Sequence, residues 1–295
     1  MTRSSMGDEG SIDRSHAAPG HAASGPRGTG ADAARIGPAG IDPRGAVVRR
    51  RLAGIGRIAA FCSAKGGVGK TLCTTVAGLA LAGQGKKVGI LDLDFQGSSA
   101  HTFLGVLPHF PEEEKGLVPL AVTDGLCLMS AAAFSGNRAL ALRGPEVSDA
   151  ILELLAVTQW GKLDLLLIDM PPGIGEEVLD LGRLIPRMEA LVISTPSAAS
   201  TSVVERLLAF LADMRITVAG VIANMVQGNA GSVRDMALRY QVPFVGEVEL
   251  EPGIEGALGN PRRLAESRAA GALLAALQTA ELVHTAPKDT TRRES

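Results

Sequence analysis

The chain has 295 residues, of which 46% are hydrophobic, and a formal net charge of −2. This length suits one large α/β domain or two small ones. The near-neutral charge offers no bulk attraction to nucleic acid or anionic lipid, so neither is expected as a partner. No apolar run approaches the roughly 20 residues that span a bilayer. The first residues also lack the pattern of a secretory signal, so we expect a soluble, cytoplasmic protein.

The composition divides the chain into three parts. Residues 1–52 are rich in small, polar and basic side chains without periodicity, which predicts a disordered N-terminal tail. Residues 283–295 are polar and are predicted to be a flexible C-terminal tail. The folded domain is therefore expected to cover residues 53–282.

Apolar strand-like runs alternate with helix-like stretches inside this domain. Strands are predicted at 57–63, 87–93, 125–130, 163–169, 190–194, 218–223 and 244–248, and helices at 71–82, 146–160 and 264–279. Strands that are apolar throughout are buried on both faces, and their alternation with helices makes them mostly parallel. The expected fold is a doubly wound α/β domain with a mostly parallel sheet and helices on both faces. The segment 101–124 is predicted to be a loop, which either is solvated or faces a partner.

A glycine-rich turn follows the first strand and precedes the first helix. It reads Ala64-Lys65-Gly66-Gly67-Val68-Gly69-Lys70-Thr71, with Leu72 next. The glycines let several backbone N–H groups turn toward phosphates, and the helix N-terminus adds partial positive charge. Lys70 is expected to reach the β- and γ-phosphates of a nucleotide, and the Thr71 hydroxyl to bind Mg²⁺. Ala64 replaces the first glycine of the strict phosphate-loop pattern.

Acidic residues follow two of the other strands. Asp92 and Asp94 end the second strand, where two carboxylates can hold the water molecules around Mg²⁺ and orient an attacking water. Asp169 ends the apolar strand 163–169 and is followed by Pro171-Pro172-Gly173. An apolar strand that ends in Asp is typical of a carboxylate that meets Mg²⁺ in phosphate-loop ATPases.

The second lysine, Lys65, gives the loop the pattern K-G-G-x-G-K-[ST]. With it the sequence resembles the MinD/ParA/Mrp group of P-loop ATPases. The resemblance implies that Lys65 crosses a homodimer interface and contacts the phosphates of the partner's nucleotide. It also implies that Asp94 positions the hydrolytic water, that Asp92 supports the metal shell, and that Asn224 hydrogen-bonds the adenine of ATP.

Residues 168–179 look most like the Mrp/ApbC branch, which is associated with carrying or assembling iron–sulfur clusters. That branch carries a C-x-x-C pair, whereas Cys62, Cys73 and Cys127 of this chain are far apart and are expected to be small buried residues. No cluster is therefore expected on its own cysteines. The sequence predicts a Mg²⁺-dependent dimeric ATPase of the Mrp type with an unknown protein partner. The alternative is a MinD/ParA-like positioning or partner-regulating ATPase without a metallocluster role.

Overall fold

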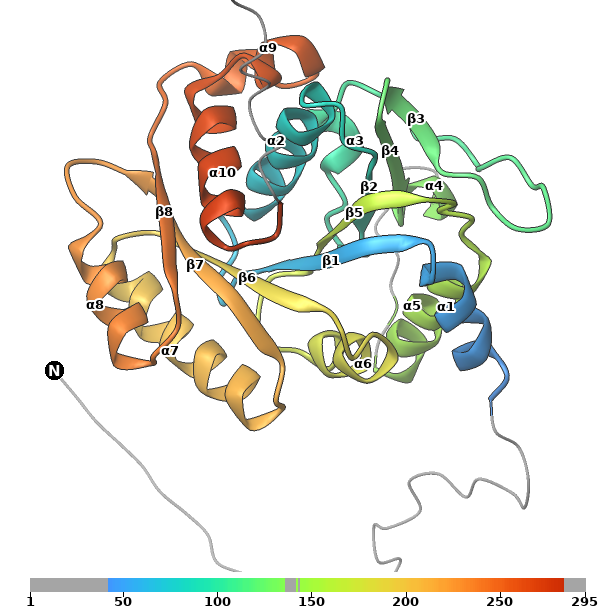
Figure 1. The fold of residues 1–295 in the computed structure, drawn as a ribbon, viewed down its shortest axis with the longest axis horizontal. Coiled ribbons are helices and arrows are strands. Elements are labelled where there is room, and N and C mark those ends of the chain that lie inside the picture. Colours follow the sequence, from blue (N-terminus) through green and yellow to red (C-terminus); the bar gives the residue numbers. More distant parts are fainter. Residues whose placement is uncertain (1–41, 136–141, 143, 284–295) are drawn as a thin grey trace, which may run out of the picture. The chain divides into compact units, whose positions relative to one another are not determined.

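The computed structural model describes residues 42–135, 142 and 144–283. Its eight strands form one sheet in the order β3-β4-β2-β5-β1-β6-β7-β8 (Figure 1). The strands are β1 Ile55–Cys62, β2 Val88–Asp92, β3 Leu120–Thr123, β4 Leu126–Ser130, β5 Leu163–Asp169, β6 Glu189–Ser194, β7 Thr217–Val226 and β8 Phe244–Glu249. The helices are α1 Arg44–Leu52, α2 Lys70–Gly83, α3 Ala100–Phe103, α4 Ala132–Ser135, α5 Pro145–Val157, α6 Glu176–Leu184, α7 Ala198–Asp213, α8 Gly231–Arg239, α9 Pro261–Ala265 and α10 Arg268–Thr279, with the 3₁₀ turn η1 at Ile254–Ala257.

The sheet is parallel except at its β3 edge, which pairs antiparallel with β4. Along β1, Ile58, Ala60 and Cys62 enter one hydrophobic core, while Ala59 and Phe61 enter the other. This alternation is the two-residue period of a strand that is buried on both faces. Helices α1, α5, α6, α7 and α8 cover the first face, and α2, α3, α9 and α10 cover the second (Figure 1). The predicted doubly wound α/β fold is confirmed.

The strand order brings three chemically important loops together. β5 lies between β1 and β2, and its Asp169 is in register with Phe61 on one side and Asp92 on the other. Since these strands are parallel, the loops that follow all three leave the same edge of the sheet. These are the loops that carry the lysines of the glycine-rich turn and the acidic residues.

The prediction that the N-terminal tail extends through residue 52 is wrong for its last part. Residues 44–52 form α1, in which Val48 and Leu52 are buried four positions apart. Arg51 also donates from Nε to the carbonyl of Ala156 over 3.1 Å. Three consecutive arginines make this segment look polar throughout, so its short apolar stripe was not recognised in the sequence. Two buried side chains are enough to pack the helix against α5. Residues 1–41 and 284–295 of the two predicted tails lie outside the described residues.

Two other expectations differ from the structure. The predicted loop 101–124 begins inside α3 and ends at β3, a four-residue strand in which half-buried and exposed residues alternate. The predicted helix 264–279 is two helices, because the Ser267 side chain accepts a hydrogen bond from the N–H of Ala270 and starts α10 afresh. A serine that caps in this way favours a helix start over a helix interior.

Candidate functional site

The glycine-rich turn between β1 and α2 has a conformation that strongly favours glycine. Gly67 and Gly69 have φ angles of 79° and 81°, in the left-handed region. A Cβ on Gly69 would lie 2.4 Å from Nδ2 of Asn224. That nitrogen donates to the carbonyl of Val68 over 2.8 Å, and Asn224 is buried at the end of β7. The Asn224 side chain therefore fixes the shape of the turn from a neighbouring strand.

Asp169 holds the first residues of α2. Its Oδ1 lies 2.5 Å from Nζ of Lys70, and its Oδ2 accepts a hydrogen bond of 2.6 Å from the Thr71 hydroxyl. The Thr74 hydroxyl donates to Oδ1 over 3.0 Å. Asp169 is fully buried and Lys70 is only 6% exposed, so the two charges compensate each other where water screens little.

The same contacts create a site with the chemistry of a divalent-cation centre. The Thr71 hydroxyl and the Asp169 carboxylate place hard oxygen donors side by side at the N-terminus of α2. Mg²⁺ prefers oxygen ligands and usually completes its shell with phosphate and water. The residues present therefore fit Mg²⁺ bound together with a phosphate-bearing ligand.

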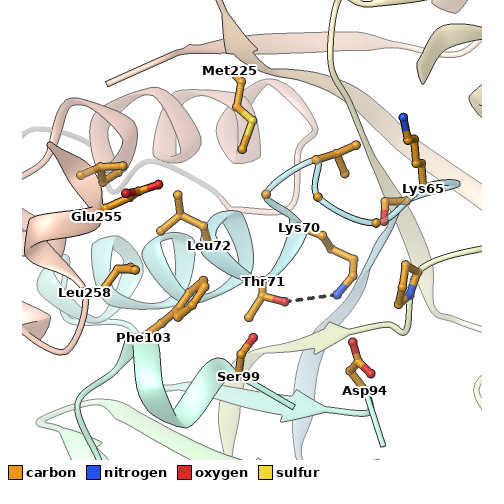
Figure 2. A pocket seen from close by; sticks show the side chains of 17 residues that line it. Lys65, Lys70, Thr71, Leu72, Asp94, Ser99, Phe103, Met225, Glu255 and Leu258 are labelled. Atoms are coloured by element: carbon orange, nitrogen blue, oxygen red, sulfur yellow. Dashed lines mark hydrogen bonds between the residues drawn. The ribbon is translucent and has the colours of Figure 1, made fainter. Parts of the chain in front are cut away.

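A cavity of about 330 Å³ opens beside these residues. Figure 2 shows Lys70, Thr71 and Asp94 around one part of it, and Leu72, Phe103, Met225 and Leu258 around another. The lining also includes Ser99, Pro172, Ile254, Glu255 and the turn itself. The cavity thus joins a charged region, suited to phosphates, to an apolar region suited to a flat ring system.

Lys65 lies on the turn at the edge of the cavity. Its side chain extends away from Lys70 (Figure 2) and is exposed. Within the described part of the chain it makes no ion pair or hydrogen bond. An exposed cation without a partner in the described residues is available to a group outside this chain.

Asp94 borders the cavity in the loop after β2. Its Oδ1 accepts hydrogen bonds from the N–H groups of Gln96 at 3.2 Å and Gly97 at 2.8 Å. These bonds form a tight turn that orients the carboxylate beside the charged part of the cavity (Figure 2).

Asp92 does not line the cavity. It is fully buried; its Oδ1 accepts from the N–H of Asp94 at 3.1 Å, and its Oδ2 accepts from the hydroxyls of Ser98 at 2.5 Å and Ser130 at 3.2 Å. Burial and the negative charge of Asp169 raise the pKa of Asp92 to about 6. In this geometry Asp92 anchors the loop that carries Asp94.

The loops after the three strands are also hydrogen-bonded to one another through their backbones. The N–H of Gly173 donates to the carbonyl of Ser63 over 2.8 Å, and that of Leu93 donates to the carbonyl of Asp169 over 3.0 Å. A displacement of any one of these loops therefore strains its hydrogen bonds to the others.

The three cysteines lie apart from one another and are poor metal ligands here. Cys62 and Cys73 are buried, and burial raises the pKa of each thiol to about 12; Cys127 is half-buried, and burial raises its pKa to about 11. A thiol must lose its proton to bind iron or zinc. Over residues 42–135, 142 and 144–283, no group of three or more His, Cys, Asp or Glu side chains is arranged to hold a metal ion.

Comparison with known proteins places this site in a family. Residues 54–281 match the family model ParA, described as the NUBPL iron-transfer P-loop NTPase. The chain belongs to this family of P-loop NTPases. The resemblance that the sequence indicated is thereby confirmed.

Relatives of this ParA-family NTPase carry names from iron–sulfur biology. It is 32% identical over 219 residues to an iron–sulfur cluster carrier protein of Mycobacterium tuberculosis, a match that covers 68% of this chain and 57% of the relative. It is 35% identical over 233 residues to the cytosolic Fe–S cluster assembly factor NUBP2 of Bos taurus, covering 72% and 85% of the two chains. The chain thus spans little more than half the length of its mycobacterial relatives.

Solved structures agree with the fold. A nucleotide-binding protein from Archaeoglobus fulgidus in complex with ADP superposes with a TM-score of 0.66 at 28% identity, covering 77% of this chain and 95% of that one. The cell-division ATPase MinD of Pyrococcus furiosus superposes with a TM-score of 0.56 at 20% identity, covering 77% and 98%, and shows the shared fold alone.

The sequence missed the apolar part of the cavity. Phe103 comes from α3, Met225 from β7, and Ile254 and Leu258 from the two ends of the η1 turn, so these residues belong to no short motif. The available signal was their position, since Met225 directly follows Asn224 and Ile254 lies just beyond β8. Ligand-contacting residues of doubly wound folds gather at such strand ends.

Proposed function

We propose that this ParA-family NTPase is a Mg²⁺-dependent ATPase of the Mrp type, which works as a nucleotide-switched homodimer and acts in iron–sulfur cluster assembly. The observation that carries the ATPase part is the contact of Asp169 with both Lys70 and Thr71 at the wall of the cavity. These three side chains combine a cation for phosphate with two oxygen donors for Mg²⁺.

The turn would bind the nucleotide's phosphates. Backbone N–H groups from Gly66 to Leu72 would donate to the phosphates, and Lys70 would neutralise part of their charge. Thr71 and Asp169 would hold Mg²⁺, Asp169 through water. The metal supplies positive charge that offsets the charge developing on the β- and γ-phosphates.

Hydrolysis needs a placed water and a second cation. Asp94 borders the charged part of the cavity and is assigned to orient the water. Lys65 is assigned to the partner's nucleotide, where it counters charge in the transition state as an arginine finger does. Loss of the γ-phosphate would then relax the linked loops after β1, β2 and β5.

The apolar part of the cavity is assigned to the adenine. Leu72 and its apolar neighbours offer contact area for the flat base. Asn224 is buried and is not among the residues that line the cavity, and its amide nitrogen is engaged by Val68. Its carbonyl oxygen is the group left to accept from the adenine amino group.

The downstream task rests on the names of the relatives. Since the chain's own thiols are dispersed and protonated, the cluster would be cargo whose cysteine ligands come from a protein partner. A MinD/ParA-like positioning or partner-regulating ATPase is the alternative, favoured by the absence of a C-x-x-C pair from the sequence. We assign the chain to the cytosol, as the name of the Bos taurus relative indicates. None of the helices in the described residues is long and apolar enough to span a membrane.

Phosphate release from ATP tests the ATPase assignment. The wild-type chain should hydrolyse ATP slowly with Mg²⁺ and not with a chelator. Lys70→Ala and Lys65→Ala should each lower the rate at least about 100-fold, since both remove charge that stabilises the transition state. Lys162→Ala, at an exposed lysine remote from the cavity, is the matched control. A wild-type rate for Lys70→Ala would refute the assignment.

Iron analysis tests the task. The chain should be captured anaerobically from its host in ATP and in ADP, and iron should be measured on the chain alone and on the captured complexes. We expect iron only in a complex, and in amounts that differ between the two nucleotides. Complexes without iron in both states would favour the positioning ATPase, and stoichiometric iron on the chain alone would contradict the assigned role of the partner.

A further inference from the structure

Exposed apolar side chains on the segment after α3 and on α4 lie outside the nucleotide site. Leu107 is 86% exposed, Phe110 63% and Phe134 36%. We call these three residues the aromatic patch. Among the described residues nine large apolar side chains are exposed, and a third of them are in this patch. Single exposed apolar residues are ordinary, whereas a group of them marks an interaction surface.

The two aromatic rings of the patch contact each other. Phe110 belongs to the segment between α3 and β3, and Phe134 belongs to α4. Their ring centroids are 5.6 Å apart at an interplanar angle of 79°, an edge-to-face arrangement. Edge-to-face contact is one of the preferred arrangements of aromatic pairs and restrains both rings. Phe110 is therefore presented in a defined position, although most of its surface faces solvent.

The segment that carries Leu107 and Phe110 is anchored at its base, next to the β3 edge of the sheet (Figure 1). Arg51 donates to the carbonyl of Lys115 over 2.6 Å. The N–H of Leu117 donates to the carbonyl of Val157, and the N–H of Gln159 donates to the carbonyl of Leu117, each over 2.8 Å. A preformed surface loses little entropy on binding, so this anchoring favours a docking role.

The charge beside the patch indicates the chemistry of its occupant. Glu112, Glu113 and Glu114 follow Phe110 within four residues, and all three are exposed; Lys115, the next residue, is exposed too and leaves this stretch with a net negative charge. None of them makes an ion pair within the described ranges. Three neighbouring carboxylates repel nucleic acid and anionic lipid, and attract cationic side chains. An apolar centre with an acidic border is complementary to an apolar segment flanked by Lys or Arg.

We propose that the aromatic patch and its acidic border, Glu112–Glu114, form a docking surface for a partner-protein segment that presents apolar side chains between basic ones. The surface is separate from the nucleotide cavity, whose lining includes none of these residues. The proposal therefore goes beyond the ATPase function, and it can be tested on the chain without nucleotide.

The test uses defined peptides and fluorescence anisotropy. The probe is a short fluorescein-labelled peptide in which Leu and Lys alternate. One comparison peptide has Glu in place of each Lys, and the other has Ser in place of each Leu. Only the Leu–Lys peptide should bind the wild-type chain, and more weakly as salt rises because exposed charges are screened.

Variants of the chain locate the binding. Phe110→Ser should weaken binding about tenfold or more, because a central aromatic side chain dominates such surfaces. The triple change Glu112→Gln, Glu113→Gln, Glu114→Gln should weaken it by about tenfold at low salt and by less at higher salt. Leu107→Ser, at the most exposed position, gives a second measurement should Phe110→Ser fail to fold.

Matched controls distinguish binding at this surface from nonspecific apolar or electrostatic binding elsewhere on the protein. Leu238→Ser removes another exposed apolar side chain, 77% exposed on α8, and should leave binding unchanged. The triple change of the exposed Asp124, Asp213 and Asp235 to Asn removes equal charge elsewhere and should also have no effect. Equal binding by all variants, or equal binding of the Glu peptide, would overturn the proposal. So would loss of the homodimer in Phe110→Ser, because the occupant would then be a second copy of the chain.

Discussion

The buried pair of Lys70 and Asp169 allows a sharp prediction about stability. In Lys70→Ala the Asp169 carboxylate loses its cation while remaining fully buried. Asp92, also fully buried, is its register neighbour on β2, so two buried carboxylates would be neighbours without the charge of Lys70 beside them. Breaking a buried ion pair by removing one partner costs about 3–5 kcal/mol.

The remaining contacts set the value within that range. The hydroxyls of Thr71 and Thr74 still donate to Asp169 after the lysine is removed. Hydrogen bonds to a charged group offset part of its desolvation, so the expected loss is near the lower limit, about 3 kcal/mol.

Urea unfolding of the nucleotide-free chain, followed by circular dichroism, measures this loss. The double variant Lys70→Ala/Asp169→Asn should recover at least about 2 kcal/mol relative to the sum of the two single changes, because the uncompensated charge is then gone. Lys162→Ala should stay within about 0.5 kcal/mol of wild type, since it is exposed and unpaired in the described chain. A Lys70→Ala chain as stable as wild type, or additive single changes, would refute the reasoning.

Three further predictions follow from the site. Because the pKa of Asp92 is raised from 3.8 to about 6, the folded chain retains a proton that the unfolded chain releases; its free energy of unfolding should fall by up to about 3 kcal/mol between pH 4 and pH 6. Asp92→Asn should flatten this part of the measured pH curve, and an unchanged curve would contradict the assignment. Gly69→Ala should abolish ADP binding in calorimetry, since φ is 81° and the new Cβ meets Asn224 at 2.4 Å; Asn224→Ala added to it should not restore wild-type affinity, because the backbone strain remains. Of the three thiols, only the half-buried Cys127 should react with a disulfide reagent in the native chain, and all three should react in urea; fast reaction of all three without urea would show that the buried positions are wrong.

The central strands and the helices that cover them could be predicted from the sequence, because their buried positions are occupied by apolar residues in a regular pattern. A strand that is buried on both faces of the sheet appears in the sequence as a continuous hydrophobic run. The existence of such strands was therefore predictable. β3 was not predictable, because its four residues lie at a sheet edge with none of them buried, and only the pairing with β4 makes the segment a strand. The break between α9 and α10 likewise depends on a single capping serine, Ser267.

The candidate site divides in the same way. Each of the predicted site residues belongs to a short motif at the end of a strand: Lys65, Lys70 and Thr71 follow β1, Asp94 follows β2, and Asp169 ends β5. The parallel strand order brings these three motifs to one edge of the sheet. The sequence alone did not show that the Asp92 carboxylate accepts hydrogen bonds from Ser98 and Ser130 inside the protein. Ser130 comes from β4, far along the chain, so no local motif links it to Asp92. The apolar part of the cavity was also hidden, since its residues meet only after the chain has folded.

The role of Lys65 in a shared site is the central claim of the proposed mechanism, and mixed dimers test it most directly. Lys65→Ala keeps its own Asp94 but gives its partner no lysine, whereas Asp94→Asn cannot place the water but still offers Lys65. Each variant alone should be inactive. An equal mixture should regain about a quarter of the wild-type rate of phosphate release, since half of the dimers pair unlike subunits and each of these contains one complete site. A mixture no faster than its separate components would contradict the account, because Lys65 would then act within its own subunit or not at all.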